Sequence, residues 1–325
     1  MEITDLPPEV LETILLFLSS DIKTLRSLSL VNTQFQTLAT KVPVSVSIPL
    51  QEEDLRWLKT SQVPVRSLSN CEIAAYVSDQ IFSLNLSRLR EARLVGSDYQ
   101  SRRCEVTSHY LRTVDTVCRR ARRSLLSLHL NVDLSKGRRS FRFAEILTQL
   151  RSLKSLSIHF SAHIELNQRI LQSDDTQLMI DVLLSNLPSL RIFNIYICPP
   201  RSLRISSRHL QEVGIYKSDA IQITKLELPS LRKLNIQENV VELFRKILAD
   251  KETAGRNFHE NLLSVIYEGC PNIRTINRVI LGPELRTFPR PERKVWTKTV
   301  NRLLVRRYKL EVEHMSSHLS SHRIL

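Results

Sequence analysis

A short apolar pattern, Leu-x-x-Leu-x-Leu or a close variant, recurs along the chain and constrains its fold more than any other feature. Its apolar positions alternate with polar ones, which predicts a strand with one buried face. The copies begin at Leu89, Leu125, Leu153, Leu190, Leu210 and Leu231. One short strand cannot bury its apolar side alone, so we expect the copies to stack and close a common core.

The pattern resembles the strand segment of a leucine-rich repeat, Leu-x-x-Leu-x-Leu-x-x-Asn/Cys. The ninth position tests this resemblance, because the apolar pattern does not fix it. It is occupied by the small residues Ser97, Asp133, Ser161, Cys198, Ser218 and Asn239, of which five are polar. The resemblance implies an α/β fold, an irregular solenoid with a parallel concave sheet and outer helices. The alternative is an ordinary α/β domain with several parallel strands.

The spacing of the copies is irregular. Counted from a first copy at residues 65–68, successive copies lie 20 to 37 residues apart. The short steps suit a strand with a tight return, and the long ones leave room for amphipathic helices. We expect such helices at residues 107–120, 141–150, 176–187 and 240–248. A strand is also expected at residues 44–50, and a last, atypical one begins near Ile273.

The first forty residues have a different pattern, that of three short helices. Leu6-Pro7-Pro8 precedes the first helix, since proline is tolerated only in the first turn. Either Ser20 or Asp21 can cap the second helix, and Asn32 can cap the third. Helices of about ten residues bury little core alone. We therefore expect part of their apolar surface to face another molecule or the rest of this chain.

This region resembles an F-box, the helical module that docks on the Skp-type adaptor of cullin–RING ubiquitin ligases. The resemblance is carried by Leu6-Pro7-x-Glu9, Ile14-x-x-x-Leu18 and Leu28-x-Leu30-Val31-Asn32-x-x-Phe35. One departure is Phe35, where the family often has tryptophan. The resemblance implies adaptor-facing or supporting apolar roles for Leu6, Pro7, Ile14, Leu18, Leu28, Val31 and Phe35. The alternative is that they form the buried face of an N-terminal helical cap.

Together the two resemblances imply a substrate receptor, with an F-box at residues 1–41, a repeat region at 42–285 and a basic helix and tail at 286–325. The repeat region would hold a target protein for a Skp–cullin–F-box ligase. Tyrosine, asparagine and histidine on the outward positions of a rigid sheet suit such recognition. The expected target-binding residues are His129, Asn131, His159, Asn194, Tyr196, Tyr216, Asn235 and Gln237.

The distribution of charge along the chain leaves an alternative to the substrate receptor open. The net charge is +14, of which residues 1–50 contribute −2 and the remainder +16, so two parts with different partners are expected. Residues 286–309 carry nine basic side chains and one acid. They predict a capping helix with a solvated basic face, or contact with an acidic protein or with phosphates. A scaffold that binds nucleic acid or chromatin therefore stays an alternative, as does an F-box protein acting outside a ligase.

Several classes of protein are disfavoured. The sequence has no His-Glu-x-x-His motif, phosphate loop, Gly-x-Ser-x-Gly motif or dinucleotide fingerprint, so we expect no enzyme and no cofactor. His314, His318 and His322 would align on a helix, but a metal site there is not expected. The five cysteines are far apart, which predicts reduced thiols. The N-terminus lacks a signal-peptide pattern and no stretch could span a membrane, so a cytoplasmic or nuclear location is expected.

Overall fold

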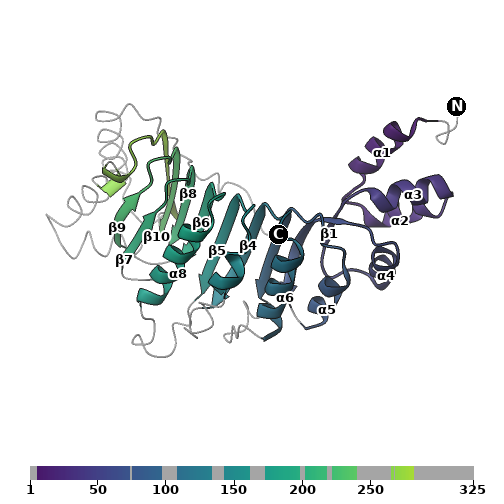
Figure 1. Cartoon of the computed structure of the whole chain (residues 1–325), viewed down its shortest axis with the longest axis horizontal. Coiled ribbons are helices and arrows are strands. Elements are labelled where there is room, and N and C mark those ends of the chain that lie inside the picture. Colours follow the sequence, from purple (N-terminus) through teal and green to yellow (C-terminus); the bar gives the residue numbers. More distant parts are fainter. Residues whose placement is uncertain are drawn as a thin grey trace, which may run out of the picture. The chain divides into compact units, whose positions relative to one another are not determined.

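The chain is analysed as a computed structural model, which describes residues 6–73, 75–96, 108–133, 143–161, 173–197, 202–217, 222–239, 265–266 and 268–281. The chain divides into two compact units, residues 1–167 and 168–325, called unit 1 and unit 2. Both are built from parallel strands and helices, so the fold is α/β (Figure 1). The expected helix at 240–248 and the basic segment at 286–309 lie outside the described residues.

Unit 1 begins with the three expected helices, α1 Pro8–Phe17, α2 Ile22–Ser29 and α3 Thr33–Lys41. Pro8 occupies the first helical position of α1, where its missing N–H is no loss. Of the two candidate caps for α2, Asp21 accepts a hydrogen bond from the Thr24 amide at 3.1 Å. Asn32 caps α3 by accepting from the Phe35 amide at 2.9 Å, as its position predicts.

The strands of unit 1 form a parallel sheet in chain order. They are β1 Val44–Ser47, β2 Val65–Ile73, β3 Glu91–Gly96, β4 Ser127–Asp133 and β5 Ser155–Ser161. The apolar positions of the repeat align across neighbouring strands, since Ala92 pairs with Leu128, and Leu128 with Leu156. All three side chains are buried, with exposed fractions of 4% or less. The stacked copies therefore share one continuous core, as the pattern predicts.

Helices return the chain between these strands. They are α4 Glu52–Thr60, α5 Ala75–Ser83, α6 Ser108–Arg120 and a short helix at residues 143–147. Helices α5 and α6 cover one face of the sheet (Figure 1). They are joined by a buried hydrogen bond of 2.8 Å from the Thr113 hydroxyl to that of Ser78. Tyr110 of α6 donates to the Leu94 carbonyl of β3 at 3.1 Å, which fixes this helix on the sheet.

Unit 2 repeats this arrangement with shorter returns. Its parallel sheet is formed in order by β6 Ile192–Ile197, β8 Glu212–Lys217, β10 Lys233–Asn239 and β11 Thr275–Leu281. Phe193, Val213 and Leu234 align across three of these strands and are fully buried. The last, atypical strand predicted near Ile273 is confirmed as β11. Its neighbour β10 pairs with it in parallel.

Two strands of unit 2 were not predicted. They are β7 Ser202–Ser206 and β9 Gln222–Glu227, which pair in parallel as a separate two-stranded sheet. Leu203 and Ile205 of β7 are fully buried between polar neighbours. That alternation was a readable signal for a strand. It was missed because the short steps between copies were interpreted as tight returns.

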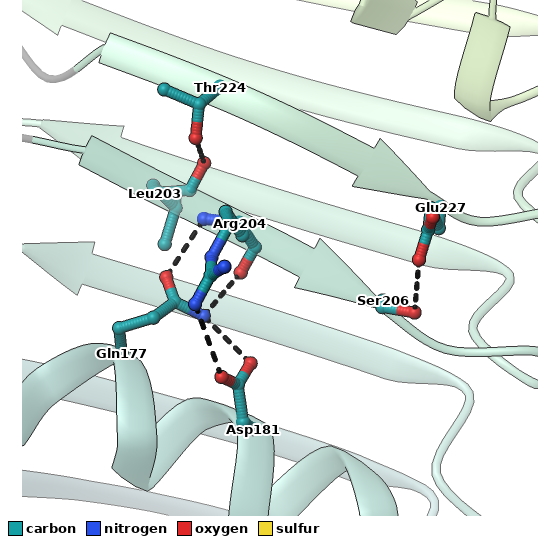
Figure 2. Close-up of polar contacts among 7 residues, drawn as sticks. All are labelled: Gln177, Asp181, Leu203, Arg204, Ser206, Thr224 and Glu227. Atoms are coloured by element: carbon teal, nitrogen blue, oxygen red, sulfur yellow. Dashed lines mark hydrogen bonds and ion pairs between the residues drawn. The ribbon is translucent and has the colours of Figure 1, made fainter. Parts of the chain in front are cut away.

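Helix α8, Ser173–Asn186, packs beside β7 (Figure 2). The Gln177 amide of α8 accepts from the Arg204 N–H at 2.8 Å and donates to the Arg204 carbonyl at 2.9 Å. A side chain thereby takes the place of a neighbouring strand at the edge of β7. Asp181 accepts from the same Gln177 amide at 2.7 Å and orients it. The edge of this small sheet is thus closed by α8.

The structure describes the side chains of two cysteines, Cys118 and Cys270, and both are buried free thiols. Burial raises the pKa of the Cys270 thiol to about 11 and raises that of Cys118 further. Both thiols are therefore protonated and unreactive at neutral pH. No helix in the described part of the chain combines the length and the apolar character needed to cross a membrane.

Candidate protein-interaction surfaces

Helix α1 has apolar side chains on two faces. Leu11 and Leu15 are buried against the rest of unit 1, with exposed fractions of 0% and 1%. Val10, Ile14 and Phe17 follow one another at helical spacing and are 42%, 36% and 84% exposed. An uncovered apolar stripe of this kind on a water-soluble surface is typical of a protein-binding site.

A second exposed apolar group lies at the end of α2. Leu30 and Val31 follow the last residue of α2 and are 80% and 62% exposed. The backbone turns here before Asn32 starts α3, so neither side chain can reach the core of the three helices. Phe17 and Leu30 were not among the expected adaptor-binding residues. The helical spacing of Phe17 with Val10 and Ile14 was a readable signal, whereas Leu30 lies in a turn, where no periodicity argument applies.

The seven expected adaptor-binding residues fall into three groups. Pro7, Ile14 and Val31 are exposed, and Leu6, Leu18 and Leu28 are half-buried. Phe35 is only 3% exposed, so it can support the module from inside but cannot contact a partner. Phenylalanine in place of tryptophan at position 35 therefore affects the stability of the three helices rather than the area of an interface.

The outward face of unit 1 carries two histidines on neighbouring strands. His129 of β4 lies in register between Arg93 of β3 and Ser157 of β5, and His159 is the next outward residue of β5. Both imidazoles are half-buried. Burial lowers the pKa of each, and for His129 the charges of Arg93 and His159 lower it further. At neutral pH this face therefore presents uncharged imidazoles, which can both donate and accept hydrogen bonds.

The outward face of unit 2 is built around two stacked tyrosines. Tyr196 of β6 and Tyr216 of β8 are register partners, and their rings lie 4.3 Å apart at an angle of 10°. Gly214 makes this possible, because a Cβ there would overlap the amide oxygen of Asn194 and lie 2.7 Å from the Tyr216 ring. Burial raises the pKa of Tyr216, with smaller contributions from Tyr196 and Glu212. The Tyr216 hydroxyl therefore stays protonated and can donate a hydrogen bond.

Beside the tyrosines, the charges of this face neutralise one another. Glu212 forms an ion pair with Lys233 at 3.2 Å and accepts a hydrogen bond from the Asn235 amide at 2.9 Å. The register places Asn235 next to Gly214 and Gln237 next to Tyr216. For Asn131 and Gln237 only the backbone is described. The described face is aromatic, amide-rich and close to neutral, which suits a protein partner better than a polyanion.

The structure offers no metal site among the residues it describes, where no three His, Cys, Asp or Glu side chains come together. His314, His318 and His322 lie outside those residues, as do Ser97, Cys198 and Ser218 of the ninth repeat position. The three other ninth-position residues are described only in their backbone. What the described geometry offers is apolar and polar contact surface on rigid elements.

No protein-family model matches this sequence, and no curated protein is significantly similar to it. Among solved structures, the chain is similar to a chain in the crystal structure of the Rad7 and Elc1 complex in yeast. The two have 15% identical residues and a TM-score of 0.32, with 80% of this chain and 76% of the other covered. A TM-score of this size carries no argument about fold or function.

Proposed function

We propose that this chain is the substrate receptor of a Skp–cullin–F-box ubiquitin ligase. In this proposal residues 1–41 dock on the Skp-type adaptor, and residues 42–285 hold a target protein. The observation that carries the proposal is the uncovered apolar surface of α1 and of the turn after α2. It lies in the segment that resembles an F-box, whose task is to present such a surface.

The pattern of burial supports this assignment over a helical cap. A cap would turn its large apolar side chains inwards, as Leu11, Leu15 and Phe35 do. Phe17 and Leu30 instead remain more than three-quarters exposed, at 84% and 80%. Covering apolar surface contributes about 25 cal/mol per Å², so a partner that covers these side chains gains several kcal/mol. The three helices thus have one face for their own core and another for a second molecule.

The outward faces of the two units supply the proposed target contacts. Stacked tyrosines and amide side chains on strands are held rigidly, so they lose little conformational freedom when a partner binds. Tyrosine provides a large contact area together with a hydroxyl that can pair at the rim of an interface. The neutral histidines of unit 1 add hydrogen-bonding groups that carry no desolvated charge.

In this proposal the chain catalyses no reaction. A conjugating enzyme bound to the RING subunit transfers ubiquitin to a lysine of the target. The receptor holds target and enzyme in one assembly and so raises their effective concentration. Such a role needs rigid placement of both partners and no catalytic residues.

Adaptor recovery tests the proposal. The variants Phe17→Asp and Val31→Asp each place a charge on the exposed apolar surface, and Leu178→Asp is the control. Leu178 is an exposed leucine of α8, at 48%, far along the chain from the docking helices. Purified chain is mixed with a Skp-type adaptor and the bound adaptor is quantified, with circular dichroism to verify folding. We expect at least about a tenfold loss for Phe17→Asp and Val31→Asp and none for Leu178→Asp. Equal recovery by all three variants refutes the proposal.

The positive charge outside residues 1–50 favours a second candidate, a scaffold that binds nucleic acid. This candidate is tested by measuring how much of the chain is retained on DNA or RNA at low and high salt, for the full chain and for a chain without residues 286–325. A salt-sensitive loss of binding on truncation would support it. An F-box protein that acts outside a ligase is distinguished by recovery of the adaptor without any cullin.

A further inference from the structure

The residues that precede the strands of unit 2 form a row along one edge of its sheet. The row consists of Arg191, Gln211, Arg232 and Arg274, each followed directly by a strand. Their backbones are joined in sequence. The Gln211 N–H donates to the Arg191 carbonyl at 2.8 Å, Arg232 to Gln211 at 2.8 Å, and Arg274 to Arg232 at 2.9 Å. Arg232 and Arg274 therefore lie side by side on neighbouring chain segments.

A hollow of about 330 Å³ opens at this edge and is lined by Gln211, Ser230, Arg232, Asn272 and Arg274. Two of the lining side chains are fixed by backbone carbonyls. The Ser230 hydroxyl donates to the Arg208 carbonyl, and the Asn272 amide donates to that of Pro229, both at 2.7 Å. One water takes up about 30 Å³ of liquid, so the hollow has room for a small oxyanion and several waters.

The lining residues that the structure describes carry positive charge and include no carboxylate. Neither the Arg232 nor the Arg274 guanidinium hydrogen-bonds or pairs with another residue that the structure describes. The nearest acidic residue on these strands, Glu212, is already engaged by Lys233 and Asn235. Two like charges on neighbouring strands repel each other, and an anion between them removes that repulsion. The site therefore has hydrogen-bond donors and unbalanced charge for one anion.

We propose that Arg232 and Arg274, with Gln211 and Asn272, form a binding site for a phosphate group on a phosphorylated side chain of the target protein. Two guanidiniums offer forked donors that match the oxygens of a phosphate dianion. The Gln211 amide and the second N–H of Asn272 supply neutral donors from the same lining. The assignment to a target side chain rests on the proposed function, whereas the anion site itself does not.

The row favours a single phosphate over a nucleic-acid backbone. The Arg191 guanidinium donates to the carbonyls of Pro188 and Leu190 at 3.0 and 3.1 Å and is held against its own loop. The uncharged Gln211 follows it, so the guanidiniums of the row that make no hydrogen bond to a described residue are those of Arg232 and Arg274. A backbone tracked over several phosphates requires a longer run of cations.

The position of the site also connects it to the proposed target face. Gln211 directly precedes Glu212 and Arg232 directly precedes Lys233. Glu212 and Lys233 are register partners on the face that carries the tyrosines, since Glu212 and Tyr216 lie an even number of residues apart on β8. A target protein bound to this face would contact Glu212 and Lys233, which are adjacent in sequence to the lining residues Gln211 and Arg232. A phosphorylated residue there could enter the site while the rest of the target keeps its contacts.

Titration calorimetry on the full chain tests the inference, with N-acetyl-phosphoserine methylamide as the probe. Its unphosphorylated counterpart, inorganic phosphate and a single-stranded oligonucleotide are run beside it. The test variant is Arg232→Gln/Arg274→Gln. The control is Arg122→Gln/Arg123→Gln, which removes the same charge from two exposed arginines of unit 1. We expect the phosphorylated probe to bind, inorganic phosphate to bind no more tightly, and the unphosphorylated counterpart and the oligonucleotide not to bind. The affinity for the probe should be weakened about tenfold or more by the test variant and unchanged in the control.

Three results would overturn the inference. They are no binding of the phosphorylated probe by the wild-type chain, equal weakening by both double variants, and binding of inorganic phosphate or of the oligonucleotide that is tighter than binding of the probe. The same test variant is also assayed for adaptor recovery, which should be unchanged. If the test variant loses phosphate binding but still recovers the adaptor, the phosphate site is independent of the docking helices. The inference of a phosphate site and the proposed adaptor-docking function can therefore fail separately.

Discussion

Arg26 on α2 and Asp54 on α4 form an ion pair with their charged atoms 2.9 Å apart. The Asp54 side chain is only 6% exposed and that of Arg26 is 27% exposed, so the pair is largely shielded from water. The two atoms approach without an aligned hydrogen bond, and the contact is electrostatic. Together with a 2.8 Å hydrogen bond from the Ser45 amide to the Ser19 carbonyl, it fastens the three N-terminal helices to the first repeat.

Removal of the charge at Arg26 should loosen this junction. Arg26→Met keeps the aliphatic stem but leaves the buried Asp54 carboxylate unpaired, which we expect to cost about 2–3 kcal/mol. Glu53→Ala is the matched control, because Glu53 approaches Arg26 only to 3.6 Å and is 77% exposed. Hydrogen exchange of α2 and α4 should accelerate in Arg26→Met alone. Similar exchange in the two variants would show that the pair does not hold the junction.

Gln177 should matter for the small sheet of unit 2 (Figure 2). Gln177→Ala leaves the N–H and carbonyl of Arg204 without the partners they have in the structure, and we expect a loss of about 1–3 kcal/mol. Asn186→Ala on the same helix is the control, since its amide donates to the Val182 carbonyl at an exposed site. Urea unfolding measures the difference. Faster hydrogen exchange at β7 in Gln177→Ala should accompany it, and unchanged exchange there would contradict the edge-closing role.

Gly269 is expected to tolerate no side chain. A Cβ at this position would overlap the carbonyl oxygen of Leu226 in β9, and backbone cannot move aside as a side chain can. The Gly269 carbonyl also accepts a 2.8 Å hydrogen bond from Leu228, which holds the two segments together. We expect Gly269→Ala to lower the free energy of unfolding by about 3 kcal/mol or more. A loss under 1 kcal/mol in urea unfolding would contradict this close approach.

Gly214→Ala also adds one methyl group, but at Gly214 the atoms that it would overlap belong to side chains, whereas at Gly269 they belong to the backbone. The new methyl group would displace Asn194 and the ring of Tyr216, so the stack with Tyr196 should be disrupted at a cost of about 1 kcal/mol. Near-ultraviolet circular dichroism should change while the far-ultraviolet spectrum stays the same. An unchanged near-ultraviolet spectrum would mean that Gly214 is not what permits the stack.

The repeat pattern predicted the strands of the main sheet in each unit, but not β7 and β9, because one buried face per strand imposes alternation on the sequence. The same pattern predicted their parallel order, since each copy can bury its leucines only against its neighbours. Helix caps such as Asp21 and Asn32 were readable because a side-chain oxygen is needed where amides lack partners. These features are encoded locally.

Features that depend on contacts between distant segments were not readable in this way. The closing of β7 by Gln177 and the approach of Gly269 to Leu226 join residues whose sequences give no hint of each other. The exposure of Phe17 likewise depends on which face of α1 the rest of the unit covers. Sequence reasoning placed the candidate residues on segments that are strands in the structure, but it could not predict the tyrosine stack or the two neighbouring arginines at the edge of the sheet.

Stability should fall in mildly acidic solution because of the two histidines of unit 1. The folded chain lowers the pKa of His129, mainly through burial and then through Arg93 and His159, and burial lowers that of His159. Below the ordinary histidine pKa of about 6.5, the unfolded chain takes up protons that the folded chain resists. The free energy of unfolding should therefore decline as the pH drops from 7 to 5, and the two histidines should contribute nothing to this decline well above pH 6.5.

Urea unfolding of the variant His129→Gln/His159→Gln measures the contribution of the two histidines. Its free energy of unfolding should decline less over this pH range than that of the wild type, whereas His209→Gln, at an exposed site, should follow the wild type. A decline in the double variant as steep as in the wild type would place the responsible groups elsewhere.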